Sequence, residues 1–387
     1  MSFKVPFSYL QEQFASIDDY LADVGALVRS GDFTLGAVVE EFESKFARVA
    51  GLSHAVGVGS GTDALALSLH ALGIGPGDEV ITTPLTFTAS VAVIEHVGAT
   101  PVLADIRPDT LNIDPAEVRA AVTDSTRAII AVHYGGHPCD LDELQAICDE
   151  HDLLLIEDAA HAIPAKYKGR FIGSSDNPVA FSFYATKNLT TAEGGMLTGS
   201  PEMIEKGVVA SLHGMNRDAW KRHDKTGSWR YDIITPGYKY NMTDLQAGMG
   251  LAQLRRLESM QARRREIAGL YTEAFSGLDA FDLPVELEGC ESAWHLYPLR
   301  LKPGKWSISR DEFIEELRTR NIGTSVHFIA VHTFTYYREK YGYAPGDFPV
   351  AFGESERVVT IPLHPGLGEE DVSDVIDSVV DVVRSRT

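Results

Sequence analysis

The sequence has few cysteines, no long apolar run and few basic residues. Its three cysteines are too few and too scattered for a disulfide framework or a metal cluster, so we interpret them as small core thiols: Cys139, Cys148 and Cys290. The stretch MSFKVPFSYLQEQF contains no apolar segment like that of a secretory signal, and no other stretch is long enough to span a membrane. We therefore expect a cytoplasmic protein with no membrane partner and no bound metal.

The charge balance is strongly acidic. The chain has 34 Lys and Arg against 55 Asp and Glu, a formal net charge of −21. This balance argues against nucleic acid or an anionic membrane as a partner, and an anionic substrate would require a local basic patch. With 387 residues, the chain is long enough for one large domain and a smaller one.

Short β-like runs alternate with helix-like segments from about residue 50. The runs DEVITT, TPVLADI, RAIIAVHY and LLLIED are separated by helical patterns, which predicts an α/β fold with a mostly parallel sheet between helices. In such sheets, ligands bind outside the carboxyl ends of the strands. One of the helices, GTDALALSLHALG, is expected to be capped by Thr62 or Asp63 and to end at Gly73.

The second half of the chain predicts a separate, smaller unit. Residues 243–275 are predicted to form one long helix leading away from the sheet. Beyond it, the β-like runs AWHLYPLRL, GTSVHF and ERVVTIPL mix with helices at 309–320 and 369–384. We predict a large domain over residues 1–245. Residues 246–387 are predicted to hold the linking helix and a small α+β domain, against which about residues 1–30 could pack.

Several chemically useful side chains follow the predicted strands. In FSFYATKNLTTAEGG, Lys187 lies where an apolar run ends in a small-residue loop, and Ser182 lies five residues earlier. Asp158 and His161 follow LLLIE, and GSGTDAL (59–65) opens a helix whose first N–H groups favour an anion. Taken singly, these features fit a solvated lysine, a helix cap or magnesium ligand, and a tight turn. Together they form the set that pyridoxal phosphate needs: an amine, a carboxylate for the ring nitrogen and a phosphate site.

The order and spacing of these motifs resemble the DegT/StrS nucleotide-sugar aminotransferases, which have the aspartate aminotransferase fold (fold type I). The resemblance covers nearly the whole chain. It is carried by GDFTLGAVVEEFESKFA, GVGSGTDALALSLHALGIGPGDEVITTPLTF, IEDAAHAIPAKYKGRFIG, FSFYATKNLTTAEGGML, PGYKYNMTDLQAGMGLAQL, AWHLYPLRL and NIGTSVHF.

The resemblance implies a role for each matching residue. Lys187 would be the Schiff-base lysine, Asp158 the partner of the pyridinium nitrogen, and His161 a neighbour of the phenolic oxygen. The remaining cofactor contacts would be ring stacking by Phe87 and phosphate binding by Gly61, Thr62, Ser182 and Asn241. In the family the asparagine comes from the partner subunit, which implies an obligate homodimer with shared active sites.

The resemblance also implies the substrates. Glutamate would be the amino donor, and the threonine-rich TTAEGG favours amination at carbon 4 of a nucleotide sugar, most similar to enzymes that make UDP-4-amino-4-deoxy-L-arabinose. Phe87 and Tyr184 stand where those enzymes usually have tryptophan and histidine. The sugar side of the pocket would include Tyr184 and His327. The basic loop 217–230 would bind the diphosphate through Lys221, Arg222 and Arg230.

Other functions compete with this interpretation. Amination at carbon 3, or of a non-nucleotide ketone such as a cyclitol, stays open because the same motifs occur in those enzymes. A sugar dehydratase of this fold carries histidine in place of the lysine, which disfavours that activity. A regulatory protein of the same fold would need a DNA-binding segment with a basic face, and the chain is acidic.

Overall fold

A computed structural model describes residues 3–8, 10, 17–216 and 231–387. Its largest element is a seven-stranded sheet of order β1-β9-β8-β5-β4-β2-β3, in which β9 alone runs antiparallel to its neighbours. The strands are β1 (Ala55–Val58), β2 (Glu79–Thr82), β3 (Thr100–Leu103), β4 (Thr126–Val132), β5 (Leu154–Asp158), β8 (Val179–Ser182) and β9 (Gly195–Thr198). The predicted α/β fold with a mostly parallel sheet is confirmed.

Both faces of this sheet are buried, because its strands are apolar at successive positions. Ile130 and Ile156 face one helix layer, while Ile129 and Leu155 face the other. The first layer contains α4 (Gly61–Ala71), α5 (Ala89–His96) and α8 (Pro201–Ser211). The second contains α3 (Ala37–Ala50), α6 (Pro115–Ala121), α7 (Leu141–His151) and α9 (Asp244–Leu254), with α2 (Ile17–Ser30) against α9.

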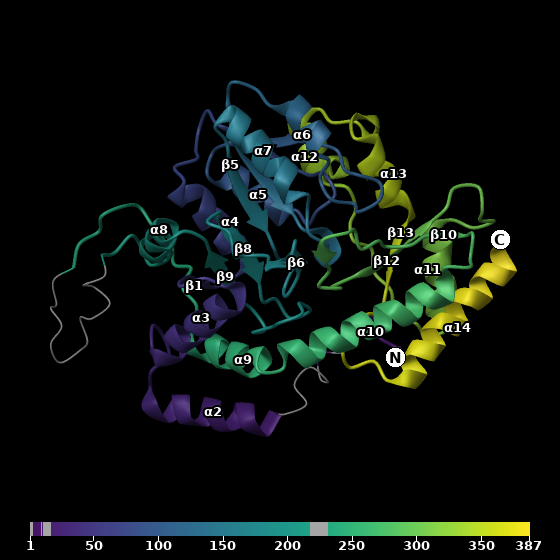
Figure 1. Cartoon of the computed structure of the whole chain (residues 1–387), viewed down its shortest axis with the longest axis horizontal. Coiled ribbons are helices and arrows are strands. Elements are labelled where there is room, and N and C mark those ends of the chain that lie inside the picture. Colours follow the sequence, from purple (N-terminus) through teal and green to yellow (C-terminus); the bar gives the residue numbers. More distant parts are fainter. Residues whose placement is uncertain (1–2, 9, 11–16, 217–230) are drawn as a thin grey trace.

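The C-terminal part has its own sheet and core. In Figure 1, α10 runs from the large sheet toward this part, where α14 lies beside it. The antiparallel strands are β10 (Phe281–Asp282), β12 (Tyr297–Leu301) and β13 (Val358–Ile361), and the helices are α10 (Leu257–Phe275), α11 (Arg310–Thr319) and α14 (Glu369–Arg386). Val5 lies in this core and forms a bridge with Ile322. A further small sheet joins β11 (Cys290–Glu291), β6 (Lys166–Tyr167) and β7 (Arg170–Phe171).

Residues 328–351, the return segment, leave the small sheet and pack on the large one. Val331 N–H donates to the carbonyl of Pro84 at 2.7 Å, and Tyr337 Oη lies 2.8 Å from Thr88 Oγ1. Asp105 accepts from the first N–H groups of α13. The elements here are α12 (Thr335–Tyr341), α13 (Pro349–Arg357) and the short 3₁₀ turns η3 (Val331–Thr333) and η4 (Pro345–Asp347); a third turn, η1 (Tyr134–Gly136), follows β4. The return segment therefore contacts the chain just before α5, through Pro84 and Thr88, and holds the start of that helix in place.

Three local predictions are wrong. The helix expected over 243–275 is two helices, because the chain turns at Arg255 and Arg256 to leave the large sheet for the small one. The cap of α4 is Ser60, whose extended backbone lets its Oγ accept from Asp63 N–H at 3.1 Å. The run GTSVHF forms only a bridge from Ser325 to Thr360, since the chain then turns toward Tyr134. No helix in the described ranges is long and apolar enough to cross a bilayer.

Candidate active site

Lys187 lies in a tight loop between β8 and β9. Its N–H donates to the carbonyl of Tyr184 at 2.9 Å, and the hydroxyls of Thr190 and Thr191 donate to backbone carbonyls inside the loop. The threonine hydroxyls therefore add side-chain hydrogen bonds that hold the backbone of the loop together. Burial lowers the pKa of the Lys187 ammonium to about 8, although the charge of Asp158 acts in the opposite direction. The lysine reaches its reactive neutral form close to neutral pH.

Asp158 ends β5, the strand beside β8. The two strands are parallel and pair Asp158 with Ala180, so the loops after both strands open at the same sheet edge. The carboxylate is buried: Oδ2 accepts from Ser90 Oγ at 2.7 Å, and Oδ1 accepts from Ala160 N–H at 3.1 Å. The strand order brings the predicted amine and carboxylate to one place.

The helix that starts after β1 forms the third part of the site. Gly61 begins α4 directly against Ser182: a Cβ on Gly61 would lie 2.8 Å from Ser182 Cβ and 3.2 Å from its Cα. A side chain at residue 61 would fill this space. The first N–H groups of a helix lack acceptors within it, so those of Gly61 and Thr62 are suited to an anion. The predicted phosphate-binding residues of this chain therefore lie together.

Three histidines lie close enough to Lys187 to feel its charge, and all are neutral at pH 7. Burial, reinforced by the positive charge of Lys187, lowers the pKa of His161 well below its usual range and that of His327 to about 4. Burial, with a smaller contribution from His161, also lowers the pKa of His295 well below its usual range. His161 Nδ1 accepts from Gly135 N–H at 3.3 Å, which leaves the ring proton on Nε2. His161 can therefore donate from Nε2 to an oxygen of a bound group.

The two aromatic residues predicted for the pocket are exposed in the single chain. Phe87 is 62% exposed and lies 6.5 Å, between ring centroids, from Phe328. Tyr184 is 48% exposed. Both side chains are open to a ligand or to a second chain, and their predicted roles stay predictions.

The remaining predicted contacts are Asn241 and three residues of the basic loop. The backbone of Asn241 bridges to Val58 at the end of β1; its amide donates to the carbonyl of Met242 and accepts from Lys239 Nζ. All these contacts are with its own chain, and its reach into a partner's site stays a prediction. The three predicted diphosphate ligands fall outside the described residues: Lys221, Arg222 and Arg230.

Sequence reasoning missed four residues that support the site. Asn188, next to the lysine, donates to the carbonyls of Ile163 and Ala293, and its Oδ1 lies 3.0 Å from His295 Nδ1. The hydroxyls of Thr86 and Ser90 form a second group behind Asp158. The motifs AWHLYPLRL, KNL and PLTFTAS contain these residues, but nothing in the spacing shows which side chains meet.

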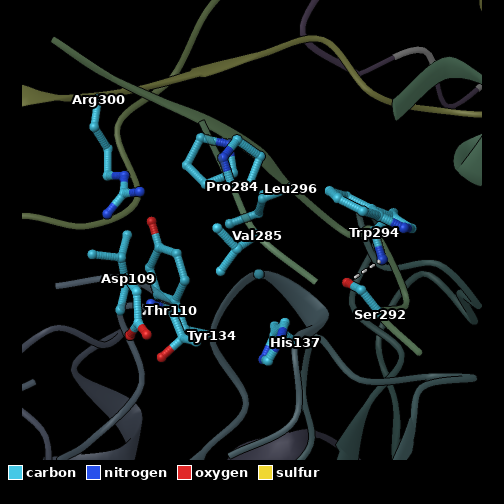
Figure 2. A pocket seen from close by; sticks show the side chains of 13 residues that line it. Asp109, Thr110, Tyr134, His137, Pro284, Val285, Ser292, Trp294, Leu296 and Arg300 are labelled. Carbon is cyan, nitrogen blue, oxygen red and sulfur yellow. Dashed lines mark hydrogen bonds between the residues drawn. The ribbon is translucent and has the colours of Figure 1, made fainter. Parts of the chain in front are cut away.

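A small cavity next to the site is shown in Figure 2. It has a volume of about 30 Å³, room for about one water molecule, and lies between the end of β4 and the chain leading to β12. Tyr134, His137 and Arg300 are among the residues that line it, and in Figure 2 the side chains of Tyr134 and Arg300 point toward one another. Its lining includes none of the candidate cofactor residues, so we assign it to packing between the two parts. Within the described ranges, no group of three His, Cys, Asp or Glu side chains could hold a metal ion.

The site fits pyridoxal phosphate in its donor set. Three groups supply the three required functions. They are a lysine with a lowered pKa, a buried carboxylate on the adjacent strand, and a helix N-terminus at Gly61, where a side chain would fill the space next to Ser182. The fold and the site define a pyridoxal-phosphate-dependent transaminase.

Comparisons with known proteins agree with this class. Residues 16–380 match the DegT/DnrJ/EryC1/StrS aminotransferase family, and the chain belongs to that family. It is 50% identical over 366 residues to the spore coat polysaccharide biosynthesis protein SpsC of Bacillus subtilis, covering 94% of each chain.

Solved structures superpose over the whole length. S. venezuelae DesV has a TM-score of 0.89 at 35% identity, covering 99% of each chain. The putative sugar aminotransferase Spr1654 of Streptococcus pneumoniae, in its PMP-form, has a TM-score of 0.90 at 35% identity, covering 100% of this chain and 99% of its own. Its PLP-form has also been solved.

Proposed function

We propose that this chain transfers an amino group from glutamate to a keto nucleotide-sugar at carbon 4. The observation that best supports the transaminase site is that Lys187 and Asp158 follow adjacent parallel strands at one edge of the sheet and interact electrostatically. A sugar ketone is supported by the names of two similar proteins, a spore coat polysaccharide biosynthesis protein and a putative sugar aminotransferase. Carbon 4 rests on the TTAEGG sequence after the lysine.

Bound pyridoxal phosphate would supply an electron sink for the negative charge left when the substrate loses a proton. Lys187 would hold the cofactor and then, as a free amine, move a proton between the substrate carbon and the cofactor carbon. Asp158 would keep the ring nitrogen protonated. His161 Nε2–H would donate to the phenolic oxygen, and the N–H groups of Gly61 and Thr62 would bind the phosphate.

The first experiment separates the transaminase site from the choice of substrate. Borohydride treatment should abolish the visible band of the loaded enzyme and trap the cofactor on Lys187, and Lys187→Ala should have neither band nor activity. Lys206, an exposed lysine paired with Glu202, offers a matched Ala substitution that should keep both. Label recovered on another lysine would refute the assignment.

Oxoglutarate release from glutamate, with a panel of 4-keto and 3-keto nucleotide sugars and a cyclitol ketone, tests the substrate. Turnover with the 4-keto sugars supports the proposal. A preference for a 3-keto sugar or a cyclitol ketone would contradict it without affecting the lysine assignment.

We further propose that the basic loop binds the diphosphate, because an acidic chain needs local cations for such a substrate. Neutralising its cations should raise the Michaelis constant for the nucleotide sugar steeply and leave the glutamate half-reaction unchanged. The substitutions are Lys221→Gln, Arg222→Gln and Arg230→Gln. Equal loss in both half-reactions would contradict diphosphate binding by the loop.

We also propose a homodimer with shared sites. Besides Phe87, apolar side chains are exposed just after the basic loop: Ile233 is 51% exposed and Ile234 60%. Contiguous exposed apolar groups favour a protein interface. Sedimentation at micromolar concentration should give a dimer, and a monomer with full activity would contradict shared sites.

A further inference from the structure

The Asp158 carboxylate is held from behind by two buried hydroxyls. Ser90 Oγ lies 2.7 Å from Asp158 Oδ2, and Thr86 Oγ1 lies 2.8 Å from Ser90 Oγ. Ser90 is 1% exposed and Thr86 3%. A serine hydroxyl has a single proton, and the short bond to the carboxylate is stronger than the alternative bond to the carbonyl of Phe87 at 3.4 Å. Ser90 therefore donates to Asp158 and accepts from Thr86.

Two donors from different elements fix the rotation of the carboxylate. Ala160 N–H, just beyond β5, binds Oδ1, while Ser90, in the first turn of α5, binds Oδ2. A carboxylate can accept about four hydrogen bonds, so these two leave lone pairs for a third donor. We propose that Ser90, supported by Thr86, is a positioning residue that orients the Asp158 carboxylate toward the ring nitrogen of pyridoxal phosphate.

The same turn also carries Phe87. Its side chain is exposed, whereas those of Thr86 and Ser90 are buried. Thr88 lies 2.8 Å from Tyr337 Oη, so the return segment holds this turn in place. This one turn would thereby position both Phe87, which is predicted to stack on the cofactor ring, and the Asp158 carboxylate. Supporting residues commonly hold reactive groups in this way. The inference rests on the role proposed above for Asp158.

The test compares Ser90→Ala with Ser90→Thr, which keeps the hydroxyl, and with Thr86→Val, which removes only the second hydroxyl. Ser68→Ala is the matched control, because Ser68 is also a buried serine but donates to the carbonyl of Ala64 within α4. We expect Ser90→Ala to slow the glutamate half-reaction roughly 10- to 100-fold, by analogy with the loss of a hydrogen-bond partner that orients a metal ligand. Thr86→Val should cost less, and Ser90→Thr should recover most of the rate.

Spectroscopy and cofactor affinity provide readouts that a purely structural role would not change. Ser90→Ala should shift the pH midpoint of the visible band of the lysine-bound cofactor and weaken cofactor binding to the apoenzyme. The unfolding temperature of the apoenzyme should stay close to that of Ser68→Ala. An unchanged spectrum and rate in Ser90→Ala would overturn the proposal. The proposal would also be overturned if Ser90→Ala lowered the unfolding temperature enough to explain the whole loss of rate, and if Ser90→Thr did not recover it.

A double-mutant cycle separates this inference from the role of Asp158 itself. If Ser90 acts through the carboxylate, Ser90→Ala should cost little more in an Asp158→Asn background. A full additional loss in that background would overturn the proposed action of Ser90. If Asp158→Asn alone keeps a near-normal rate, the role proposed for Asp158 fails instead.

Discussion

The pKa of Lys187 gives the most direct test of the site, because two neighbouring effects act on it in opposite directions. Burial lowers the pKa from 10.5 to about 8, and the charge of Asp158 raises it. Asp158→Asn removes the attraction and keeps the shape of the side chain. The pKa of Lys187 should therefore fall further, below 8, in Asp158→Asn apoenzyme.

The size of the effect follows from the two pKa values. At pH 7, an amine with a pKa of about 8 is about one-tenth neutral, whereas an ordinary lysine is neutral in about one molecule in 3,000. Lys187 should thus present roughly 300 times more reactive amine than an exposed lysine at that pH. The imine with pyridoxal phosphate should form correspondingly faster.

Competitive labelling of apoenzyme amines across pH 6–11, read by mass spectrometry, measures this for each lysine separately. Lys187 should label with a midpoint near pH 8. Lys302 is the internal control, because its hydrogen bond to Asp279 raises its pKa. A midpoint for Lys187 near that of Lys302, or an upward movement in Asp158→Asn, would refute the electrostatic reasoning.

Three other predictions concern activity, assembly and stability. Asp158→Asn should lose on the order of 100-fold or more in turnover, since a neutral amide cannot keep the ring nitrogen protonated; a near-normal steady-state rate would make Asp158 a cap only. Mixing inactive Lys187→Ala with Asn241→Ala, which should bind the cofactor weakly, should restore activity once subunits exchange, because one site of the heterodimer then carries neither substitution. No recovery after proven exchange would place Asn241 in its own subunit's site. Burial raises the pKa of Glu43 from 4.5 to about 7, so folding disfavours its ionised form and stability is lost as pH rises through this window. Glu43→Gln can still accept from Gly57 N–H, and thermal unfolding should show it stabilised at pH 8, by at most about 3 kcal/mol, but not at pH 4.5; equal shifts at both pH values would contradict this.

Local patterns in the sequence were sufficient for the main elements and for the first candidates. Strands that are buried on both faces appear in the sequence as continuous apolar runs, and the first polar residue after each run marks the end of the strand. Asp158 and Lys187 could therefore be placed at strand ends without knowledge of which strands are neighbours. Gly61 could be predicted for a similar reason, since a run of small residues before a helical pattern can be recognised from the sequence alone.

The sequence patterns did not specify the order of the strands in the sheet. They also did not specify the contacts between residues that are distant in the sequence. Alternation of strands and helices does not say that β5 lies beside β8, which is what brings Asp158 close to Lys187. Nor does it show that Ser90 meets Asp158 across 68 residues, or that Asn188 meets His295 across 107. The turn between α9 and α10 contains neither glycine nor proline, so no local signal marks it.

The sequence by itself determined the chemistry available to the chain: a lysine, a carboxylate and a phosphate-binding turn, each at the end of an apolar strand. Tertiary structure decided how those groups are held. Burial lowers the pKa of the lysine, and hydroxyls from a distant turn orient the carboxylate. The physical reason is that periodicity and backbone preference are encoded locally. Desolvation and side-chain hydrogen bonds instead depend on which segments pack together, and only the folded chain fixes that packing.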